Sequence, residues 1–241
     1  MRLDVYLADN ALVDSRTDAK NFILSGAVTV EGKVITKPSY DVTGDENIAV
    51  DKSGKRFVSR GGLKLEGALN SFEIDVSDAL AIDIGASSGG FTDCLLKRGA
   101  YHVIAVDSGS GQMVDSLRKD PRVTVIENFN ARYMSPEDFG YTPNLAVMDV
   151  SFISAKLIIP AVGNILQSGS SFICLIKPQF EVGRSGLNKK GIVKNDALRK
   201  SAVEDVKDFA LCCGFELGGL IESPIVGGDG NIEYLAHFIK K

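Results

Sequence analysis

The stretch "DIGASSGGF" (residues 83–91) decides the fold of this chain. It follows the apolar run "ALAI" (79–82) and precedes a segment with the apolar spacing of a helix. A strand, a glycine turn and a helix N-terminus together present free backbone N–H groups and a positive dipole end, which suit a nucleotide-like ligand. The turn reads Gly85-Ala-Ser-Ser-Gly89-Gly90, whereas a dinucleotide-binding fold favours G-x-G-x-x-G. An ordinary tight turn between strand and helix is the alternative at this point.

The alternation of short apolar segments with amphipathic ones on either side of this stretch predicts a parallel α/β sheet. Strands are expected at 80–84, 102–107, 123–127, 144–149 and 171–177, and helices around 62–70, 90–98, 110–119, 155–167 and 196–212. The runs 216–223 and 232–239 are joined by "PIVGGDGN" (224–231), which is too short for a helical crossover. We therefore expect an antiparallel hairpin to finish the sheet. A doubly wound, Rossmann-like sheet closed in this way is typical of S-adenosylmethionine-dependent methyltransferases, by analogy of fold.

The first fifty residues form a different pattern, a small α+β unit. Ser15 can cap a helix, and "AVTVEGKVI" (27–35) reads as short alternating strands. The polar, glycine-containing stretch "VDKSGKRFVSRGG" (50–62) then reads as a linker. We place the boundary near residue 58, which gives two domains, 1–58 and 59–241.

Composition indicates a globular protein. The 241 residues are 44% hydrophobic and 24% charged, enough for a large core and a second, small domain. Four cysteines without C-x-x-C spacing and two histidines make no plausible zinc set, so we expect no metal and reduced thiols in the cytoplasm. The start lacks the pattern of a signal peptide, and no stretch approaches the roughly 18 apolar residues of a membrane span. We expect no membrane partner.

Charged residues stand at the ends of three predicted strands. Asp107 ends "HVIAVD" (102–107), Asp149 ends "LAVMD" (145–149) and Lys177 ends "FICLIK" (172–177). Ligands of open α/β sheets bind at this carboxyl edge, so these side chains indicate a site there. The net charge of −4 hides two basic runs, 52–64 without an acid and 184–200 with Asp196 as its only acid. Either run could be a solvated loop or a nucleic-acid contact.

Several longer motifs resemble the TlyA family, in which an S4 RNA-binding domain precedes an FtsJ-like ribose methyltransferase domain. They are "MRLDVYL", "SRTDAKNFILSGAVTVEGKVITKPS", "VSRGGLKLEGAL", "DIGASSGGFTDCLLKRGA", "DPRVTVIENFNAR", "DVSFIS", "KPQFEVGRSGLNKKGIV" and "GDGNIEYL". Their order and spacing cover nearly the whole chain. The resemblance implies methyl transfer from S-adenosylmethionine to a ribose 2′-hydroxyl of ribosomal RNA, on cytidine, with ribosomal RNA or ribosomal subunits as partners.

The same resemblance assigns candidate residues. The catalytic tetrad would be Lys64, Asp149, Lys177 and Glu233. Cofactor contacts would come from the glycine turn, the strand ends and the segment "ENFNAR" (127–132), namely Asp83, Gly85, Ala86, Ser87, Gly89, Gly90, Asp107, Asn128, Asn130 and Asp149. RNA contacts would come from basic side chains, namely Arg2, Arg16, Lys20, Lys33, Lys37, Arg60 and Arg132.

The chemistry of the tetrad is coherent on its own terms. A ribose 2′-hydroxyl is a weak acid, so its proton has to be removed as it attacks a methyl sulfonium. Lys177 could be the base if Lys64 and partial burial lower its pKa, with Asp149 and Glu233 orienting the ammonium groups. Other acceptors fit less well, because "DVSF" (149–152) lacks the prolines of exocyclic-amine enzymes, and Cys174 and Cys94 read as buried structural thiols.

Two other function classes stay open at this stage. Members of the family have carried a hemolysin label, so cytolysis is one alternative, and a non-catalytic RNA-binding or ribosome-assembly factor is another. The family pattern Arg-Ala-Trp-Val is replaced here by Lys55-Arg56-Phe57-Val58, which leaves open whether linker coupling and substrate range are shared. The sequence does not determine the modified nucleotide, the ribosomal subunit or the oligomeric state.

Overall fold

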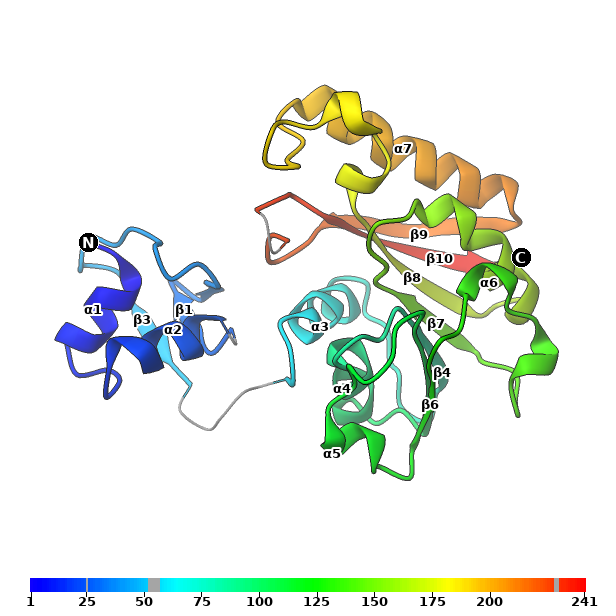
Figure 1. Ribbon diagram of the computed structural model, residues 1–241, viewed down its shortest axis with the longest axis horizontal. Coiled ribbons are helices and arrows are strands. Elements are labelled where there is room, and N and C mark those ends of the chain that lie inside the picture. The colour runs from blue at the N-terminus through cyan, green and yellow to red at the C-terminus, as the bar shows by residue number, and fades with distance from the viewer. Residues whose placement is uncertain (25, 52–56, 228–229) are drawn as a thin grey trace.

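The chain folds into a small N-terminal unit and a larger α/β unit (Figure 1). The computed structural model describes residues 1–241 except 25, 52–56 and 228–229. The linker residues Lys52, Lys55 and Arg56 therefore lie outside the described residues. Phe57 is buried in the core of the larger unit, and the Val58 N–H donates to the Asp93 carboxylate at 2.8 Å. The division near residue 58 stays a prediction.

The small unit contains two helices and a three-stranded antiparallel sheet. Its elements are α1 (Leu3–Asp9), α2 (Arg16–Leu24), β1 (Val28–Val30), β2 (Lys33–Val34) and β3 (Ile48–Val50), with the strand order β2-β1-β3. The Ser15 hydroxyl accepts the Asp18 N–H at 3.1 Å, which confirms the predicted cap of α2. Apolar side chains from both helices and the sheet, among them Leu3, Leu7 and Ile23, form a core of its own.

A seven-stranded sheet is the centre of the larger unit, as the alternating pattern predicts. Its strands are β4 (Leu80–Ile84), β5 (His102–Val106), β6 (Val123–Ile126), β7 (Leu145–Met148), β8 (Ser171–Ile176), β9 (Phe215–Glu222) and β10 (Tyr234–Lys240). They lie in the order β6-β5-β4-β7-β8-β10-β9. The first five are parallel, and β10 pairs antiparallel with both β8 and β9. The closing hairpin thus places the last strand of the chain inside the sheet, next to β8.

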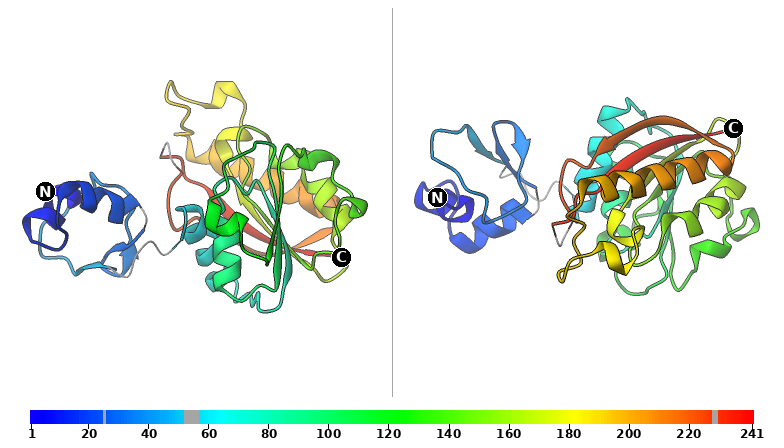
Figure 2. Two further views of the ribbon diagram at one scale, coloured as in Figure 1. Left: turned by 60° about the horizontal axis from the view of Figure 1, so that its bottom comes forward. Right: turned by 90° about the horizontal axis from the view of Figure 1, so that it is seen from above.

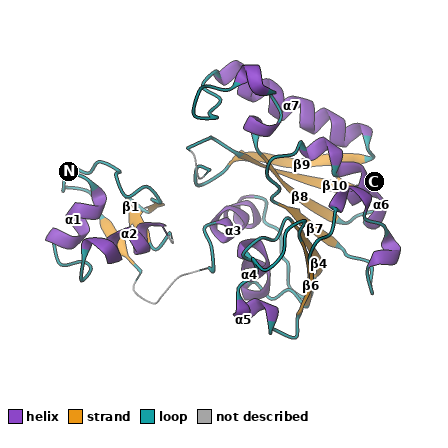
Figure 3. Ribbon diagram, viewed as in Figure 1, coloured by secondary structure: helices purple, strands orange, loops and turns teal. Residues whose placement is uncertain are grey.

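Helices cover both faces of this sheet (Figures 1 and 3). One face packs with α3 (Gly61–Ser71), α4 (Gly90–Lys97) and α5 (Asp115–Arg118), and the other with α6 (Ile159–Ile165) and α7 (Asp196–Cys212). Successive residues along each strand belong to opposite cores: Ala81 packs with the first set of helices and Ile82 with the second. Short 3₁₀ helices lie at Ala131–Tyr133, Pro136–Asp138, Ala155–Leu157, Pro178–Phe180 and Arg184–Gly186.

Two of the expected helices are shorter than their apolar spacing predicts. The helix expected over 110–119 is only α5, because Gly111 has a positive φ of 69° and its N–H donates to the Glu127 carboxylate at 2.8 Å. The helix expected over 155–167 is divided into the 3₁₀ turn Ala155–Leu157 and α6, which begins next to Pro160. Proline is tolerated in a first helical turn but not further inside one.

Candidate functional site

Two cavities meet at the carboxyl edge of the large sheet. The first, of about 290 Å³, is lined by basic and hydroxyl side chains from α3 and the strand ends, and the second, of about 370 Å³, lies over β4 and β5. Both are lined by Gly85, Ser87, Asp149 and Ser151. A molecule in one cavity would therefore face a molecule in the other across the ends of β4 and β7.

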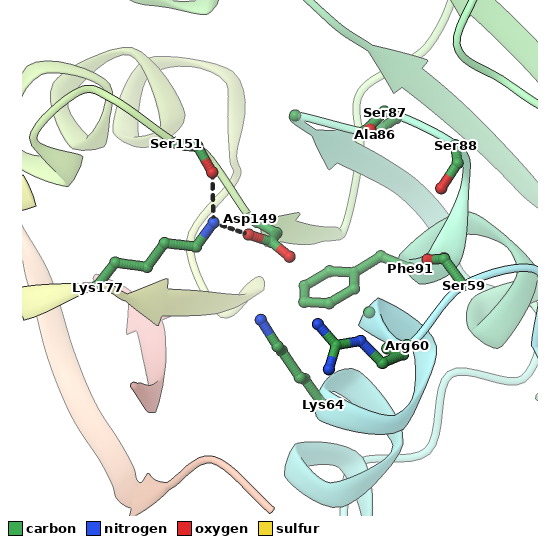
Figure 4. A pocket seen from close by; sticks show the side chains of 13 residues that line it. Ser59, Arg60, Lys64, Ala86, Ser87, Ser88, Phe91, Asp149, Ser151 and Lys177 are labelled. Carbon is green, nitrogen blue, oxygen red and sulfur yellow. Dashed lines mark hydrogen bonds and ion pairs between the residues drawn. The ribbon is translucent and has the colours of Figure 1, made fainter. Parts of the chain in front are cut away.

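Lys177 lines the first cavity, next to two of the residues that line both, Asp149 and Ser151. It follows β8, is only 9% exposed, and forms an ion pair with Asp149 at 2.6 Å. Its Nζ also donates a hydrogen bond to the Ser151 hydroxyl at 2.7 Å. Figure 4 shows the ammonium held between these two side chains, with Asp149 reaching toward the space in front of α3. Two oxygens thus fix the position of one nitrogen.

Lys64 forms the second ion pair of the predicted tetrad. Its Nζ lies 2.6 Å from Glu233 Oε2, and the two residues are 8% and 3% exposed. Lys64 comes from α3, and Glu233 immediately precedes β10, so the pair joins segments far apart in the chain. Burial strengthens this attraction but also makes either charge costly without its partner. The structure therefore brings the four tetrad residues to one place as two pairs, Lys64 with Glu233 and Lys177 with Asp149.

Arg60 lines the first cavity beside Lys64. It lies directly before α3, and Figure 4 shows its guanidinium next to the Lys64 side chain, on the side of the cavity opposite Lys177. Of the three cations that line this cavity, Lys64 is paired with Glu233 and Lys177 with Asp149, whereas Arg60 forms no ion pair with a described residue, so the lining has a positive excess. Such a lining suits an anionic ligand.

The second cavity has the features expected of a nucleoside site. Asp107 lines it, with one carboxylate oxygen accepting the Ser87 N–H at 2.8 Å and the other the Gly109 N–H at 2.7 Å. Phe129 and Ile153 supply apolar surface, and Asn130 lines the same cavity. A carboxylate, an amide and apolar side chains in one lining suit a ligand made of a ribose and a base.

Asp83 is a carboxylate with one oxygen left without a partner. It is fully buried on β4, and its Oδ2 accepts the Thr92 hydroxyl at 2.6 Å, whereas no described residue hydrogen-bonds Oδ1. Burial raises the pKa of Asp83 to about 7, with a further contribution from the nearby Asp149 charge, while the Thr92 hydrogen bond acts in the opposite direction. An unsatisfied buried oxygen of this kind fits the ammonium group of an amino-acid ligand.

Two positions of the turn require glycine, because neighbouring protein atoms leave no room for a side chain there. Gly85 has a φ of 83°, and a Cβ there would lie 2.6 Å from the Asp149 carbonyl oxygen. A Cβ on Gly90 would lie 2.2 Å from the Ser59 hydroxyl. Ala86 and Ser87 line the first cavity together with these two glycines. The turn thus forms part of the wall between strand and cavity, as the sequence predicts.

Some predicted residues do not reach the cavities. Asp83, Gly89, Asn128 and Glu233 line neither one. Asp83 is fully buried beneath the turn, and Gly89 precedes α4 with a φ of 96°. Arg132 is exposed, hydrogen-bonds the Asn130 side chain and lies over the Tyr133 ring. Of the other predicted RNA contacts, Arg60 lines the first cavity and the remaining five are on the small unit. There, Arg2 and Arg16 pair with the buried Asp4, and Lys20, Lys33 and Lys37 are exposed.

Three side chains were missed by the sequence analysis. Ser151 holds Lys177, Thr92 holds Asp83, and the Gln179 amide lies 3.4 Å from Glu233. Ser151 follows Asp149 by two residues and Gln179 follows Lys177 by two. Their closeness in sequence to tetrad residues is a signal, but hydroxyl and amide side chains are too common near strand ends for it to be decisive.

Comparison with known proteins agrees with this geometry. Residues 57–240 match the FtsJ-like methyltransferase family, and residues 1–48 match the S4 domain. A Mycobacterium tuberculosis protein named 16S/23S rRNA (cytidine-2′-O)-methyltransferase TlyA is 41% identical over 97% of this chain and 87% of its own length. The chain belongs to the TlyA family of FtsJ-like methyltransferases. The resemblance seen in the motifs is thereby confirmed.

Other TlyA-family relatives carry different names. YqxC of Bacillus subtilis, described provisionally as an rRNA methyltransferase, is 45% identical over 98% of this chain and 84% of that protein. Hemolysin A of Brachyspira hyodysenteriae is 44% identical over 99% of this chain and the whole of that protein. A solved structure from Streptococcus thermophilus, provisionally described as a hemolysin, has a TM-score of 0.77 at 44% identity and covers all of this chain and 88% of its own.

Proposed function

We propose that this protein transfers the methyl group of S-adenosylmethionine to a ribose 2′-hydroxyl of ribosomal RNA, on cytidine. The observation that supports this most is the position of Lys177, fixed by Asp149 and Ser151 where the two cavities meet. Membership of the FtsJ-like family and the TlyA relative's printed activity support the same reaction. The S4 domain supports RNA as the substrate class.

The second cavity suits the cofactor. Asp107 would hold the ribose hydroxyls, Asp83 the amino group, and the Gly85 turn the methionine portion. When bound, S-adenosylmethionine supplies an electrophilic methyl group on a sulfonium. The unpaired Asp83 Oδ1 and the missing side chain at Gly85 are the observations that fit this ligand. Asn130 would lie near the base.

The first cavity suits the RNA. Arg60 and Lys64 would contact phosphate. Lys177 would first lose one ammonium proton to solvent, and the neutral amine would then accept the 2′-hydroxyl proton as the oxygen attacks and the methyl–sulfur bond breaks. Asp149 and Ser151 hold the Lys177 nitrogen in place, and Glu233 holds Lys64. A positioned acid or base contributes about 10²–10⁴-fold to a rate, and alignment of the reacting atoms contributes further.

The placement of the cysteines argues against methylation of a base carbon and so supports an oxygen acceptor. Methylation at carbon 5 of a pyrimidine needs a cysteine thiolate, but Cys174 and Cys94 are both fully buried in apolar cores. Burial also raises the pKa of the Cys174 thiol, which disfavours the thiolate. Cys212 and Cys213 are less buried, but none of the four cysteines lines either of the two cavities.

The decisive experiment replaces Lys177 with Met, which keeps the apolar stem and removes the ammonium. Single-turnover transfer to ribosomal RNA from cells that lack the protein should fall at least ~10²-fold at saturating RNA and cofactor, with cofactor affinity retained. Lys119→Met, on an exposed lysine before β6, is the matched control. Mass spectrometry of the nucleosides should find 2′-O-methylcytidine.

A Lys177→Met rate within a few-fold of the unchanged protein, or a methyl group on a base, would overturn the proposal. Because relatives are named hemolysins, release of haemoglobin from red cells is measured on the same samples. Cytolysis would be favoured if Lys177→Met still lysed red cells and neither the variant nor the unchanged protein transferred a methyl group. Among the described residues, no helix has the length and apolar content that a bilayer crossing requires.

A further inference from the structure

Four exposed cations lie on one loop of the methyltransferase unit, outside the tetrad and the cavities. The loop, residues 183–194, has the sequence "GRSGLNKKGIVK" and contains Arg184, Lys189, Lys190 and Lys194 but no acid. None of the four forms an ion pair with a described residue. By contrast, Arg199 and Lys200 on the following helix both pair with Asp196. We call residues 183–194 the basic loop.

The basic loop is ordered by its own hydrogen bonds. The Asn188 side-chain oxygen accepts the N–H groups of Lys190 at 2.8 Å and Ile192 at 3.0 Å. The Asn188 N–H donates to the Ile192 carbonyl, also at 3.0 Å. An asparagine that satisfies the backbone in this way fixes a turn. The lysines at 189 and 190 are therefore presented from the tip of a defined turn.

A buried side chain joins the basic loop to the segment that leads into β10 and contains Glu233 of the tetrad. Asn231, 3% exposed, donates to the Gly191 carbonyl at 3.0 Å and accepts the Val193 N–H at 3.1 Å. Asn231 precedes Glu233 by two residues, and Glu233 pairs with Lys64. The loop therefore has a fixed position relative to the reacting groups.

Arg199 of α7 also connects the C-terminal part of the loop to β10. Arg199 donates to the Tyr234 hydroxyl at 3.2 Å and to the Val193 carbonyl at 3.4 Å. The beginning of the loop follows Lys177 after one 3₁₀ turn, Pro178–Phe180. Figure 2 shows the segment standing out from the body of the methyltransferase unit. It projects at the carboxyl edge of the sheet, where both cavities open.

Like charges held on one small turn repel one another, and a polyanion relieves that repulsion. Lysine binds phosphate as a point charge and needs no particular base. On these grounds we propose that the basic loop binds the phosphate backbone of the RNA next to the target nucleotide, as a contact separate from the S4 domain. This inference rests on the proposed function, because it takes RNA as the substrate.

The test compares two triple variants of the full chain. K189Q/K190Q/K194Q removes three charges from the loop, and K119Q/R122Q/K241Q removes three exposed charges from the opposite edge of the sheet. Affinity for deproteinised ribosomal RNA is measured from 50 to 200 mM salt. The affinity K falls as salt rises, and each lost phosphate contact makes the negative slope of log K against log salt less steep by about 0.7–0.9. Cofactor affinity reports that each variant is folded.

We expect the loop variant to lose about two units of slope and the control variant much less. K189R/K190R/K194R should restore the slope, since it keeps the charges. Equal slopes for the loop and control variants would overturn the inference. So would normal RNA affinity combined with weakened binding to whole ribosomal subunits, because the loop would then contact protein. Methyl transfer by the unchanged protein is measured separately. If the slopes differed but no methyl group were transferred, the proposed function would be rejected and the contact between loop and RNA would be retained.

Discussion

Asp83 is a buried carboxylate whose charge depends on what lies beside it. Its pKa is raised to about 7, mainly by burial, and it faces Thr92, Asp149 and Asp107. The ordinary pKa of an aspartate is 3.8, so the folded chain holds this proton more tightly than the unfolded chain does. The stability from the protonated form is fully present below about pH 4 and is lost as pH rises through about 7. A cationic ligand group reverses this preference.

We therefore expect S-adenosylmethionine to bind more tightly at pH 8 than at pH 6, because binding needs the ionised Asp83. Calorimetry at several pH values measures this. In buffers of different ionisation enthalpy, it should also detect proton release near pH 6. Asp83→Asn should bind more weakly and lose the pH dependence in this range. If the unchanged protein and the variant showed the same pH profile, Asp83 would not be the group responsible.

Ser151 is the second partner of Lys177, and its loss should affect turnover more than binding. Hydrogen bonds to charged groups contribute about 1.5–3 kcal/mol, so Ser151→Ala should lower kcat by roughly tenfold or more. Ser151→Thr keeps a hydroxyl and should restore most of the rate. Steady-state kinetics with both variants separates kcat from KM. An unchanged kcat in Ser151→Ala would show that Asp149 alone fixes the lysine.

At the scale of elements, the β4–α4 turn should tolerate no side chain at Gly85. Gly85→Ala combines a positive φ of 83° with a Cβ 2.6 Å from the Asp149 carbonyl oxygen. Gly111→Ala has a similar φ of 69° but meets nothing within 4 Å, so it is the matched control. Both should lose about 1 kcal/mol to backbone strain. Gly85→Ala should lose more and also displace the strand end that carries Asp149.

Thermal unfolding and cofactor titration of the two alanine variants measure the difference. Equal losses of stability with normal cofactor binding in both would mean that the turn can shift to accept a methyl group.

Elements with strong periodicity could be predicted from the sequence, and the exceptions have local causes. The strands and the closing hairpin follow from apolar runs, because burial on both faces selects such segments. The insertion of β10 between β8 and β9 could not be predicted, since pairing between distant strands leaves no trace in either one. The prediction of a helix over 110–119 was wrong in its first half, because the positive φ of Gly111 and its hydrogen bond to Glu127 override the apolar spacing.

The residues of the candidate site that stand at strand ends could be predicted from the sequence, but the pairings between distant segments could not. Residues at strand ends, such as Asp149 and Lys177, converge because parallel strands end at one edge. The pairing of Lys64 with Glu233 depends on how α3 packs beside β10, and the roles of Thr92 and Gln179 depend on side-chain geometry. None of this is encoded in spacing along the chain.

At the scale of the whole molecule, the two units should contribute different properties. All four tetrad residues lie beyond residue 58, whereas five of the predicted RNA contacts lie before it. A chain beginning at Phe57 should bind S-adenosylmethionine with unchanged affinity and ribosomal RNA more weakly, with a smaller salt dependence. Calorimetry and filter binding measure the two. The full chain with K20Q/K33Q/K37Q, which changes exposed lysines and leaves the Arg2 and Arg16 pairs with Asp4 intact, should lose part of the RNA affinity. Equal RNA affinity for all three proteins would contradict this division.

The two cavities share a wall at Gly85, Ser87, Asp149 and Ser151 but have separate linings beyond it. We therefore expect the two reactants to bind in either order, each in its own cavity. We also expect spent cofactor to be exchanged while the nucleic acid stays bound. One RNA-bound complex could then bind and release cofactor several times before methyl transfer occurs. A low concentration of methyl donor would slow the reaction without causing the RNA to dissociate.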